Sequence, residues 1–390
     1  MKWPRVTVES IRAKARYSLV GGPFGSELTT RDYVEDGVPV IRGSNLPDDR
    51  CFDGRAFVFV REEKADQLLA NNAHPGDVVF TQRGTLGQVG IIPAESQFSR
   101  YLISQSQMKL SVNPAKADAK FVYYYFRHPD TVQNIKNHAV TSGVPHINLG
   151  LLREFEIPLP PVDAQREIVS ILSTYDDLIE NNRRRMALLE KAARLLYEEW
   201  FVRLRFPGHE RAKMISGVPA SFERKHLGDL LTLKRGYDLP GSDRVDGEFP
   251  IVSSSGITGF HGEKKATAPG VVTGRYGTLG EVYFIQQDYW PLNTSLYVSD
   301  FKGNRPSFAA HLLKNVLAGV QSDKAAVPGL NRNVAHQLLV LYSSQTLRDQ
   351  FADFADLSYR QQRLLETSNQ KLRSARDLLL PRLMSGEIFV

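Results

Sequence analysis

Residues 163–182 read DAQREIVSILSTYDDLIENN and open a run without proline or glycine that extends to about Arg205. Asn182 keeps the helical spacing of this run and places an amide within its apolar stripe. At about 1.5 Å per residue, about 42 residues form a rod of about 63 Å. A helix with one apolar face must pack it against a partner. The stripe recurs mostly at steps of three or four residues, and its members are Ile168, Ile171, Tyr175, Leu178, Met186, Leu189, Ala193, Leu196 and Trp200.

A second stretch of this kind begins near Ser344 and predicts a partner helix in the same chain. Residues 183 positions apart correspond, as in Leu189 with Leu372 and Leu196 with Leu379. The same shift aligns VPHIN (144–148) with VPGLN (327–331), each ahead of a long helix. We therefore predict an internal duplication. The apolar residues of the second stretch are Phe351, Phe354, Leu357, Leu365, Leu372, Leu379 and Leu383.

Composition narrows the class of protein. The 390 residues suffice for two folded domains and two long helices. A net charge of +6 is compatible with a nucleic-acid partner but does not identify one. Cys51 is the only cysteine, which excludes an intrachain disulfide and a cysteine-based zinc site and fits a reducing compartment. No stretch of about 18 apolar residues and no signal-peptide core is present, so we expect a soluble, cytoplasmic protein without a membrane partner.

The chain divides into four segments, with domains at 1–160 and 206–343 and long helices at 161–205 and 344–390. Each domain reads as an α/β unit of short strands. VPVIRGSNL (38–46) and FPIVSSSGITG (249–259) each predict a strand that enters a polar loop. Residues 75–93 and 269–285 each predict a strand, a glycine turn and a second strand. We further predict strands over 101–112 and 292–300, helices over 119–137 and 307–319, and a loop, short helix and strand before Pro160.

Several motifs together resemble the specificity subunit of a type I restriction–modification enzyme. They are LPPVDAQREIVSILSTYDDLIENN (159–182), LLYEEWFVRLRFPG (195–208), LLLPRLMSGEI (378–388) and two GTLG turns, after Arg83 and after Tyr276. The resemblance covers the whole chain. It departs at the second helix, which starts LYSSQTLRDQF without the LPP of the first.

The resemblance implies an α/β (α+β) fold with a pseudo-twofold duplication. Two target-recognition domains would be held apart by two long helices that form an antiparallel coiled coil. Each domain would read one half of a split site in double-stranded DNA. The helices would dock two methyltransferase subunits, and restriction (motor) subunits could join. S-adenosylmethionine, ATP and Mg²⁺ would then belong to the partner subunits, with no cofactor in this chain.

Motifs for catalysis are missing from the sequence. It has no GxxxxGK[ST] phosphate loop, no HExxH, no GxGxxG after a strand and no histidines at metal-ligand spacing. The carboxylate pairs Asp48-Asp49 and Asp176-Asp177 read as solvated charge. We therefore expect no catalytic and no metal site, and a binding role. Two alternatives remain, namely a DNA-modifying enzyme with an unfamiliar site and a coiled-coil adaptor without DNA specificity.

Two arginine–glycine turns are the sharpest DNA-binding candidates. Each places an arginine at a strand end, where glycine lets the backbone approach a ligand. Arginine can grip guanine O6 and N7 or a phosphate, and glutamine can pair with adenine. The alternative is an arginine that only caps carbonyl groups of its hairpin. The candidates are Gln82, Arg83 and Thr85 in the first turn and Arg275, Tyr276 and Thr278 in the second.

Short polar residues after equivalent strands form a second candidate set, since rigid strand ends suit groove contacts. Ordinary turn chemistry explains the same residue types equally well. The set comprises Arg42, Ser44, Asn45 and Gln105 in the first domain and Ser253, Ser254, Asn293 and Thr294 in the second.

Apolar residues beside the main helix stripe predict a docking face for partner subunits. We assign Leu172, Ile179, Leu188, Leu195 and Phe201 to this face. The aromatic row 123–126 could stack on bases, but four consecutive aromatics on a helix favour the core. The arginines at 183–185 could contact phosphates or a partner, and the sequence does not distinguish these.

Overall fold

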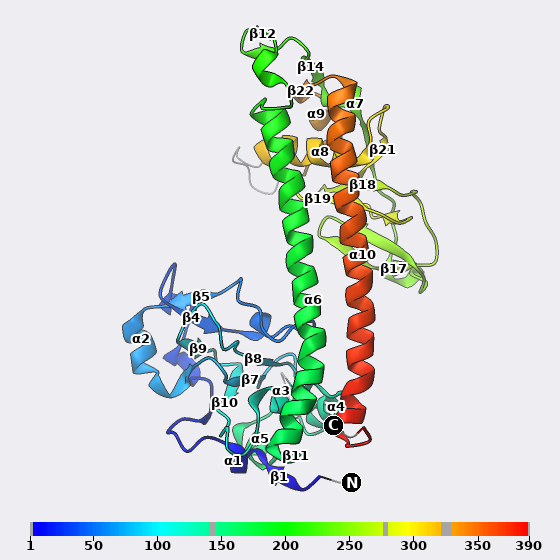
Figure 1. The fold of residues 1–390 in the computed structure, drawn as a ribbon. Coiled ribbons are helices and arrows are strands. Elements are labelled where there is room, and N and C mark those ends of the chain that lie inside the picture. The colour runs from blue at the N-terminus through cyan, green and yellow to red at the C-terminus, as the bar shows by residue number, and fades with distance from the viewer. Residues whose placement is uncertain (1–2, 140–144, 276–279, 321–328, 389–390) are drawn as a thin grey trace. The chain divides into compact units, whose positions relative to one another are not determined.

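The computed structural model describes residues 3–139, 145–275, 280–320 and 329–388 (Figure 1). The chain forms two compact units. Unit 1 comprises residues 1–181 with 368–390, and unit 2 comprises residues 182–367. Each long helix is therefore divided between the units. Among the described helices, none is long and apolar enough to cross a membrane. The described residues also contain no group of histidine, cysteine and carboxylate side chains that could hold a metal ion.

Unit 1 has two main sheets. In the four-stranded sheet the order is β2-β10-β7-β8, and in the five-stranded sheet it is β3-β5-β4-β9-β6, where β4 and β9 run parallel. A separate antiparallel pair joins β1 to β11. The strands are β1 Arg5–Thr7, β2 Leu19–Gly21, β3 Tyr33–Val34, β4 Val38–Ile41, β5 Val58–Val60, β6 Asn72–Ala73, β7 Val78–Thr81, β8 Val89–Ile91, β9 Tyr101–Ile103, β10 Gln107–Leu110 and β11 Glu156–Pro158.

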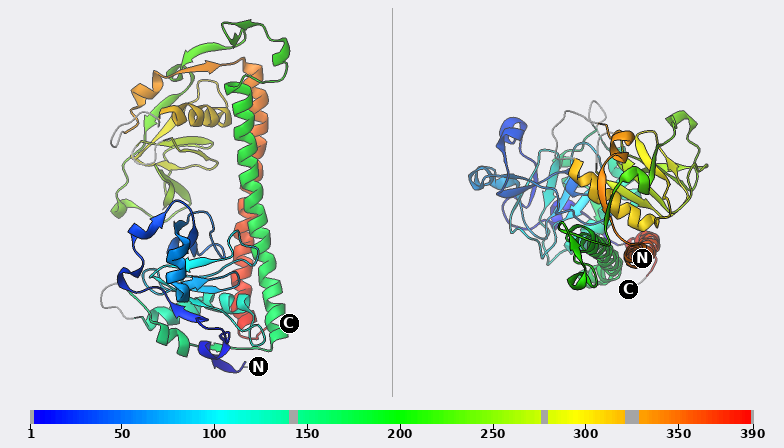
Figure 2. Two further views of the ribbon diagram at one scale, coloured as in Figure 1. Left: turned by 90° about the vertical axis from the view of Figure 1, so that its left-hand side faces the viewer. Right: turned by 90° about the horizontal axis from the view of Figure 1, so that it is seen from above.

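Helices cover unit 1 and complete its core. They are α1 Val8–Ile11, α2 Glu62–Gln67, α3 Ala119–Arg127, α4 Pro129–Asn137, α5 Leu149–Glu154, the first part of α6 (Val162–Tyr197) and the last part of α10 (Gln345–Met384). Helix α3 packs against β7 and β8. Its residues Tyr123, Tyr124 and Phe126 are buried, which confirms the core interpretation of the aromatic row. Ile168 and Leu172 of α6 share this core with Leu380 and Leu383 of α10, so the two helix ends lie side by side within unit 1 (Figure 2).

A polar chain joins α3 to this pair of helix ends. The Tyr124 hydroxyl donates to Asp176 Oδ2 at 2.6 Å. Arg376, whose side chain is 6% exposed, forms an ion pair with Asp176 and a second one with Asp377. Burial raises the pKa of Tyr124, and the Asp176 carboxylate adds to this effect. The expectation that Asp176 is solvated charge is therefore wrong, because it is held between two partners in unit 1.

Unit 2 repeats the strand order of the four-stranded sheet of unit 1 and of the central three strands of its five-stranded sheet. Its four-stranded sheet runs β15-β21-β18-β19, and β16 pairs antiparallel with β17 and parallel with β20, as β4 does with β5 and β9. Strands β14 and β22 pair as β1 and β11 do. The strands are β12 Met214–Ile215, β13 Val218–Pro219, β14 Glu223–His226, β15 Thr232–Arg235, β16 Phe249–Ser253, β17 Gly256–His261, β18 Gly270–Gly274, β19 Val282–Ile285, β20 Trp290–Pro291, β21 Ser295–Asp300 and β22 Leu339–Tyr342.

Aromatic packing dominates the core of unit 2. The helices are α7 Leu227–Leu230, α8 Pro306–Val320, α9 Arg332–His336, the last part of α6 and the first part of α10. Phe201 lies 5.5 Å from Phe351 and 5.3 Å from Phe308 between ring centroids. Helix α6 ends at Tyr197 and continues as a π-helical turn over Glu198–Val202. The α-helix is therefore shorter than the run to Arg205 that we predicted.

Two predicted elements of unit 1 are broken in the structure. Residues 101–112 form two strands in different sheets, because β9 pairs with β4 whereas β10 pairs with β7. All seven residues of these strands are buried. The alternation of apolar and polar residues therefore did not indicate a half-buried strand. Residues 119–137 form two helices, since Pro129 starts α4 and His128 caps it by accepting from the Asp130 amide at 3.1 Å.

The apolar stripe of α6 keeps most of the predicted positions and departs from the prediction near residues 171–172 and 178–179. Leu172 and Ile179 are buried, whereas Leu178 is 45% exposed. Steps of three and four continue through Asn182, which is buried as expected. This is the seven-residue repeat of a helix that packs along one seam. The buried or half-buried positions that follow this repeat are Gln165, Ile168, Leu172, Tyr175, Ile179, Asn182, Met186, Leu189 and Ala193.

Candidate nucleic-acid interface

Five chain segments of unit 1 meet near the end of β7. The Gln82 amide donates to Ser106 O at 2.7 Å, and the Ile147 amide donates to Gln82 O at 3.0 Å. The Ser104 amide donates to Ile41 O at 2.9 Å, and the Gly22 amide donates to Gln107 O at 2.8 Å. We call this meeting point corner 1, comprising residues 21–28, 41–45, 82–88, 104–107 and 145–148. These hydrogen bonds fix the backbone of corner 1.

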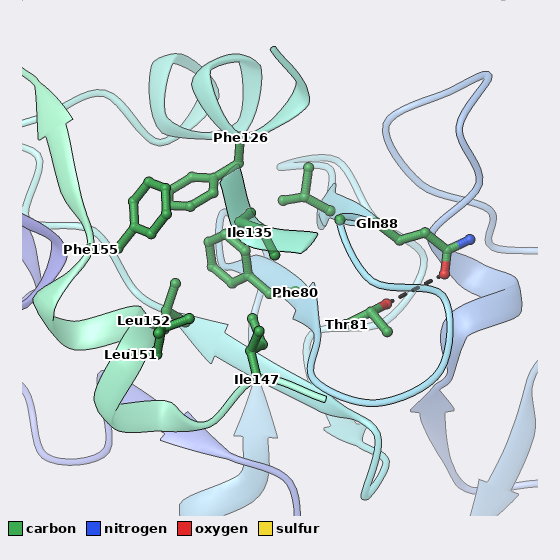
Figure 3. A pocket seen from close by; sticks show the side chains of 11 residues that line it. Phe80, Thr81, Gln88, Phe126, Ile135, Ile147, Leu151, Leu152 and Phe155 are labelled. Carbon is green, nitrogen blue, oxygen red and sulfur yellow. Dashed lines mark hydrogen bonds between the residues drawn. The ribbon is translucent and has the colours of Figure 1, made fainter. Parts of the chain in front are cut away.

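A packed apolar layer supports corner 1 from below. Phe80 of β7 meets Phe126 edge to face, with ring centroids 4.8 Å apart. Figure 3 shows Phe155, Leu152 and Ile147 around a small apolar cavity on the same side, with Thr81 and Gln88 at its polar margin. Thr81 Oγ1 donates to Gln88 Oε1 at 3.4 Å. The strand end therefore changes from apolar packing to amide and hydroxyl groups within one residue.

The side chains of corner 1 differ in their access to a ligand. Ser44, Arg83, Thr85 and Gln105 are exposed, and Gln82 is half-buried. Gly22 is needed where it lies, because a Cβ there would overlap the backbone of Ser104. The corner thus presents amide, hydroxyl and guanidinium groups on a rigid frame, which suits contacts to base edges and phosphates.

Two predicted residues of corner 1 have structural roles. Asn45 is 0% exposed; its Oδ1 accepts from the Arg42 amide at 2.8 Å and its Nδ2 donates to Asp53 O at 2.9 Å. It builds the loop after β4 and does not reach a ligand. Gln105 donates to Gly25 O and, at 2.9 Å, to Leu28 O, so its amide nitrogen holds the loop after β2.

The loop that Gln105 holds presents a residue that the sequence reading missed. Phe24 is 85% exposed, the most exposed large apolar side chain among the described residues. Its backbone amide donates to Glu27 Oε2 at 2.8 Å, which fixes the turn. The sequence signal was the run GGPFGS at 21–26, where glycine and proline surround a lone aromatic.

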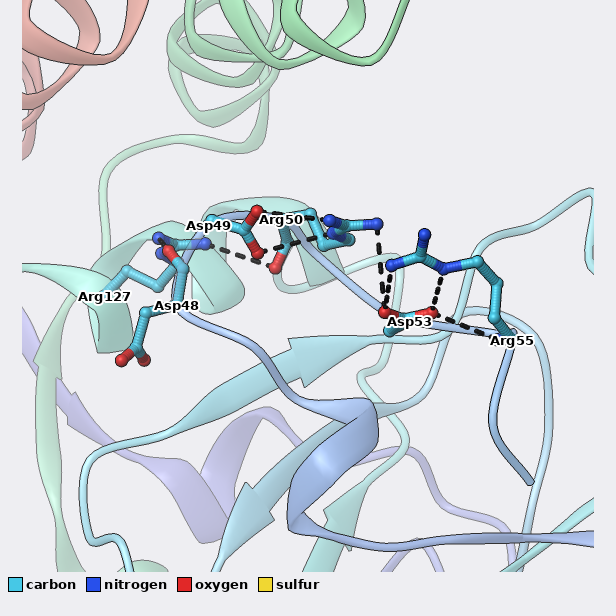
Figure 4. Close-up of polar contacts among 6 residues, drawn as sticks. All are labelled: Asp48, Asp49, Arg50, Asp53, Arg55 and Arg127. Atoms are coloured by element: carbon cyan, nitrogen blue, oxygen red, sulfur yellow. Dashed lines mark hydrogen bonds and ion pairs between the residues drawn. The ribbon is translucent and has the colours of Figure 1, made fainter. Parts of the chain in front are cut away.

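The loop that follows residues 41–45 of corner 1 carries several arginines and aspartates, whose contacts are shown in Figure 4. Asp53 accepts from Arg55 at 2.7 Å and lies 3.8 Å from Arg50. Hydrogen bonds and the charge of Arg55, together with Arg50, lower the pKa of Asp53 to about 2. Arg127 donates to the carbonyl groups of Asp48 and Arg50, which ties the loop to α3. The charges of Arg50, Asp53 and Arg55 are therefore paired within the loop, and Arg127 has a structural role.

Unit 2 repeats the backbone pattern of corner 1. The Arg275 amide donates to Thr294 O at 3.0 Å, and the Leu330 amide donates to Arg275 O at 2.8 Å. The Leu292 amide donates to Val252 O at 2.8 Å, and the Gly236 amide donates to Ser295 O at 3.1 Å. We call this meeting point corner 2, comprising residues 235–238, 252–255, 275, 292–295 and 329–332.

This pattern corrects the expected equivalence of the two arginines. Thr81 faces Gln107 across β7 and β10, and Gly274 faces Ser295 across β18 and β21. The residue that follows Gly274 is Arg275, and the one that follows Thr81 is Gln82. Arg275 therefore corresponds to Gln82, not to Arg83. Aligning the two GTLG turns gives the same answer, because RYGTLG then lies over QRGTLG.

The remaining candidates of corner 2 have mixed outcomes. Ser253 is buried and bonds to Ser255 and Gly256 within its turn, so the turn interpretation holds for it. Asn293 donates to Asp238. Ser254 and Thr294 are half-buried. Tyr276 and Thr278 lie outside the described residues.

Arginines line an open hollow at corner 2. It measures about 500 Å³, and Arg235, Arg275 and Arg332 contribute to its wall together with Leu296 and residues 329–331. Arg275 is half-buried, whereas Arg235 and Arg332 are exposed. Arg235 lies 3.3 Å from Asp238. The hollow is thus cationic and suits an electronegative or anionic group.

The predicted docking face on α6 splits into two groups. Leu172, Ile179 and Phe201 are buried within the chain, which corrects their assignment to a free surface. Leu188 and Leu195 are 64% and 40% exposed and lie one heptad apart. They remain candidates for a partner contact.

The comparisons with known proteins agree with the sequence resemblance. Residues 29–191 match the model of the type I restriction modification DNA specificity domain. The MjaIX specificity subunit of Methanocaldococcus jannaschii is 28% identical over 227 residues, which are 57% of this chain and 51% of that protein. The EcoprrI specificity subunit of Escherichia coli is 21% identical over 345 residues, covering 83% of this chain and 81% of the relative.

A solved structure supports the fold. The S subunit of a type I restriction–modification system from M. genitalium has a TM-score of 0.56 at 20% identity, covering 98% of this chain and 96% of that one. The matched regions span about half the length of the M. jannaschii relatives. The resemblance to type I specificity subunits is confirmed.

Proposed function

We propose that this chain, which carries a type I DNA specificity domain over residues 29–191, is the sequence-reading subunit of a type I restriction–modification complex. Corner 1 and corner 2 would each read one half of a bipartite site in double-stranded DNA. The chain would recognise DNA and leave the chemistry to other subunits, in line with relatives that are named specificity subunits.

The repeated corner is the observation that carries this proposal. Both units bring the same strand ends together through matching backbone hydrogen bonds, while the side chains presented there differ. An ancestral duplication followed by divergence of the ligand-facing residues accounts for both facts. Two similar frames with different side chains suit two half-sites of different sequence.

The long helices would serve as a spacer and as a platform for partners. The continuous helices α6 and α10 each contribute to the cores of both units. We propose that they form an antiparallel coiled coil whose length sets the distance between half-sites. The exposed Leu188 and Leu195 would belong to a face that docks two methyltransferase subunits, and restriction subunits could join the assembly. S-adenosylmethionine, ATP and Mg²⁺ would act in those subunits, and the complex would work in the cytoplasm.

A methylation map tests the proposal. The chain is expressed with its methyltransferase subunit in a host without other DNA methylation, and methylated bases are mapped over the genome. We expect one motif of two short sequences separated by a fixed spacer. Methylation at a continuous motif, or none beyond a control without this chain, would count against the proposal. Methylation by the chain alone would support the enzyme alternative, and partner binding without specific DNA binding would support the adaptor.

A further inference from the structure

The two corners place different side chains at matched positions. In corner 2 the hollow has Arg235, Arg275 and Arg332 in its wall. Gln107 and Ser295 are equivalent because they pair with Thr81 and Gly274, which precede Gln82 and Arg275. The next residues, Met108 and Leu296, pair with Gly21 and Arg235, so Arg235 corresponds to Gly21. The helix caps match Asn331 with Asn148, so Arg332 corresponds to Leu149. A cationic hollow in unit 2 therefore stands where unit 1 has glycine, glutamine and leucine.

The three arginines differ in the burial of their side chains and in the hydrogen bonds that hold their backbone. Both backbone polar groups of Arg275 are used, by Thr294 O at 3.0 Å and by the Leu330 amide at 2.8 Å. Its position on the frame is therefore fixed, and its side chain is half-buried. Arg235 and Arg332 are exposed at the rim. A half-buried arginine on a fixed backbone suits readout of a base edge, whereas the exposed arginines at the rim suit contacts to phosphates.

The matched residue in unit 1 has a different hydrogen-bonding character. Gln82 is fixed in the same way, through Ser106 O at 2.7 Å and the Ile147 amide at 3.0 Å. Its amide offers a donor and an acceptor, which is the complement of adenine N7 and N6. Arginine offers two parallel donors, which is the complement of guanine O6 and N7.

We infer that Gln82 and Arg275 occupy one interchangeable specificity position, which reads adenine in the half-site of unit 1 and guanine in the half-site of unit 2. Arg235 and Arg332 contact the phosphates beside that guanine. This inference rests on the proposed function and adds to it the base class and the residue that chooses it.

The test uses the chain assembled with its methyltransferase subunit and DNA duplexes that carry the mapped motif or single-base variants of it. R275Q places the unit 1 residue in unit 2. We expect its binding to the native duplex to weaken roughly 5- to 150-fold and the preferred base at one position of half-site 2 to change from guanine to adenine. Q82R should produce the reverse change in half-site 1, a gain that a merely structural role cannot create.

R235Q and R332Q should instead weaken binding to all duplexes about equally. Each should reduce the slope of the logarithm of the binding constant against the logarithm of the salt concentration by about 0.9. R211Q, at an exposed arginine of unit 2 outside corner 2, is the matched control and should change neither property. The inference is overturned if R275Q weakens all duplexes evenly, as a phosphate contact would, or if Q82R leaves base preference unchanged while the thermal melt is intact. A wild-type complex that reads no motif would reject the proposed function itself, which is a different result.

Discussion

At the scale of single residues, His311 shows what burial does to a titrating group in unit 2. The residue is 6% exposed, and its ring stacks on Tyr197 with centroids 5.9 Å apart. Burial lowers the pKa of His311 to about 4, with Lys314 adding to the effect and Glu190 opposing it. The folded state therefore holds this imidazole neutral at pH values where the unfolded chain protonates it.

We predict that unit 2 loses stability as the pH falls from about 6.5 to about 4. The pKa is lower in the folded state, so unfolding takes up a proton in this window, and His311 lowers the free energy of unfolding by about 3 kcal/mol at the acidic end. H311Q should remove this part of the pH dependence. Urea unfolding at several pH values measures it, with H138Q, at an exposed histidine, as control. Equal slopes for H311Q and the unchanged chain would contradict the prediction.

The candidate site shows what residue patterns can and cannot predict. The strand ends after Ile41 and Thr81 were predicted, because apolar runs that stop at glycine and polar residues are local signals. The burial of Asn45 and Ser253 was not, since a polar side chain that builds a turn has the same local pattern as one that faces a ligand. The match of Arg275 with Gln82 was available from the GTLG turns but required alignment through the turn rather than through the arginine.

At the scale of elements, the stripe of α6 differs from the prediction around residues 171–172 and 178–179. A helix with apolar residues at both 171 and 172 and at both 178 and 179 is compatible with two stripes. Packing in unit 1 selects Leu172 and leaves Leu178 exposed, because only the former reaches the core that contains Leu380. Tertiary contacts thus decide between neighbouring stripes that periodicity alone cannot separate.

We predict opposite effects for two kinds of leucine on α6. L172A removes a side chain that is fully buried in unit 1 and should lower the free energy of unfolding by about 2–5 kcal/mol. The double variant L188S/L195S alters exposed side chains and should leave the melting temperature nearly unchanged. It should nevertheless weaken capture of the methyltransferase subunit, because these leucines form the proposed docking face.

Thermal melts and analytical ultracentrifugation with the methyltransferase subunit separate the two effects. R194Q, at an exposed position beside Leu195, is a control for general changes on the same helix. Normal assembly of L188S/L195S would remove these leucines from the docking face.

Helix length carries the proposed spacing of half-sites, so we predict that an insertion in α6 changes the target. Four residues inserted after Arg185 should displace one recognition unit by about 6 Å and rotate it by about one turn. The native motif should no longer be methylated, or its spacer should change if α10 adapts. The same four residues inserted into the exposed loop 240–244 should leave the motif unaltered. An unchanged methylation map for the helix insertion would contradict the spacer role.

At the scale of the whole molecule, the two ends of the chain meet in unit 1. Leu380, Leu383 and Met384 belong to the same core as Val8, Phe121 and Ile168. The helix that begins in unit 2 thus completes the fold of unit 1. This arrangement could not be read from the domain segments 1–160 and 206–343 alone, because the contacts join residues that lie hundreds of positions apart.

The last prediction concerns the independence of the two half-sites. Exchanging residues 1–160 for the equivalent part of a relative should change one half of the methylated motif and leave the other, because corner 1 lies wholly within the exchanged segment. The core contacts with Ile168, Leu172, Leu380 and Leu383 cross the boundary of that exchange, so we expect a lower melting temperature. A second chimera that also carries residues 161–181 and 368–390 from the relative should restore stability and read the same new motif. The reciprocal exchange of 206–343 should change the other half. Methylation maps of all three chimeras test whether the two half-sites are read independently. A change in both halves after a single exchange would show that the units do not read DNA independently.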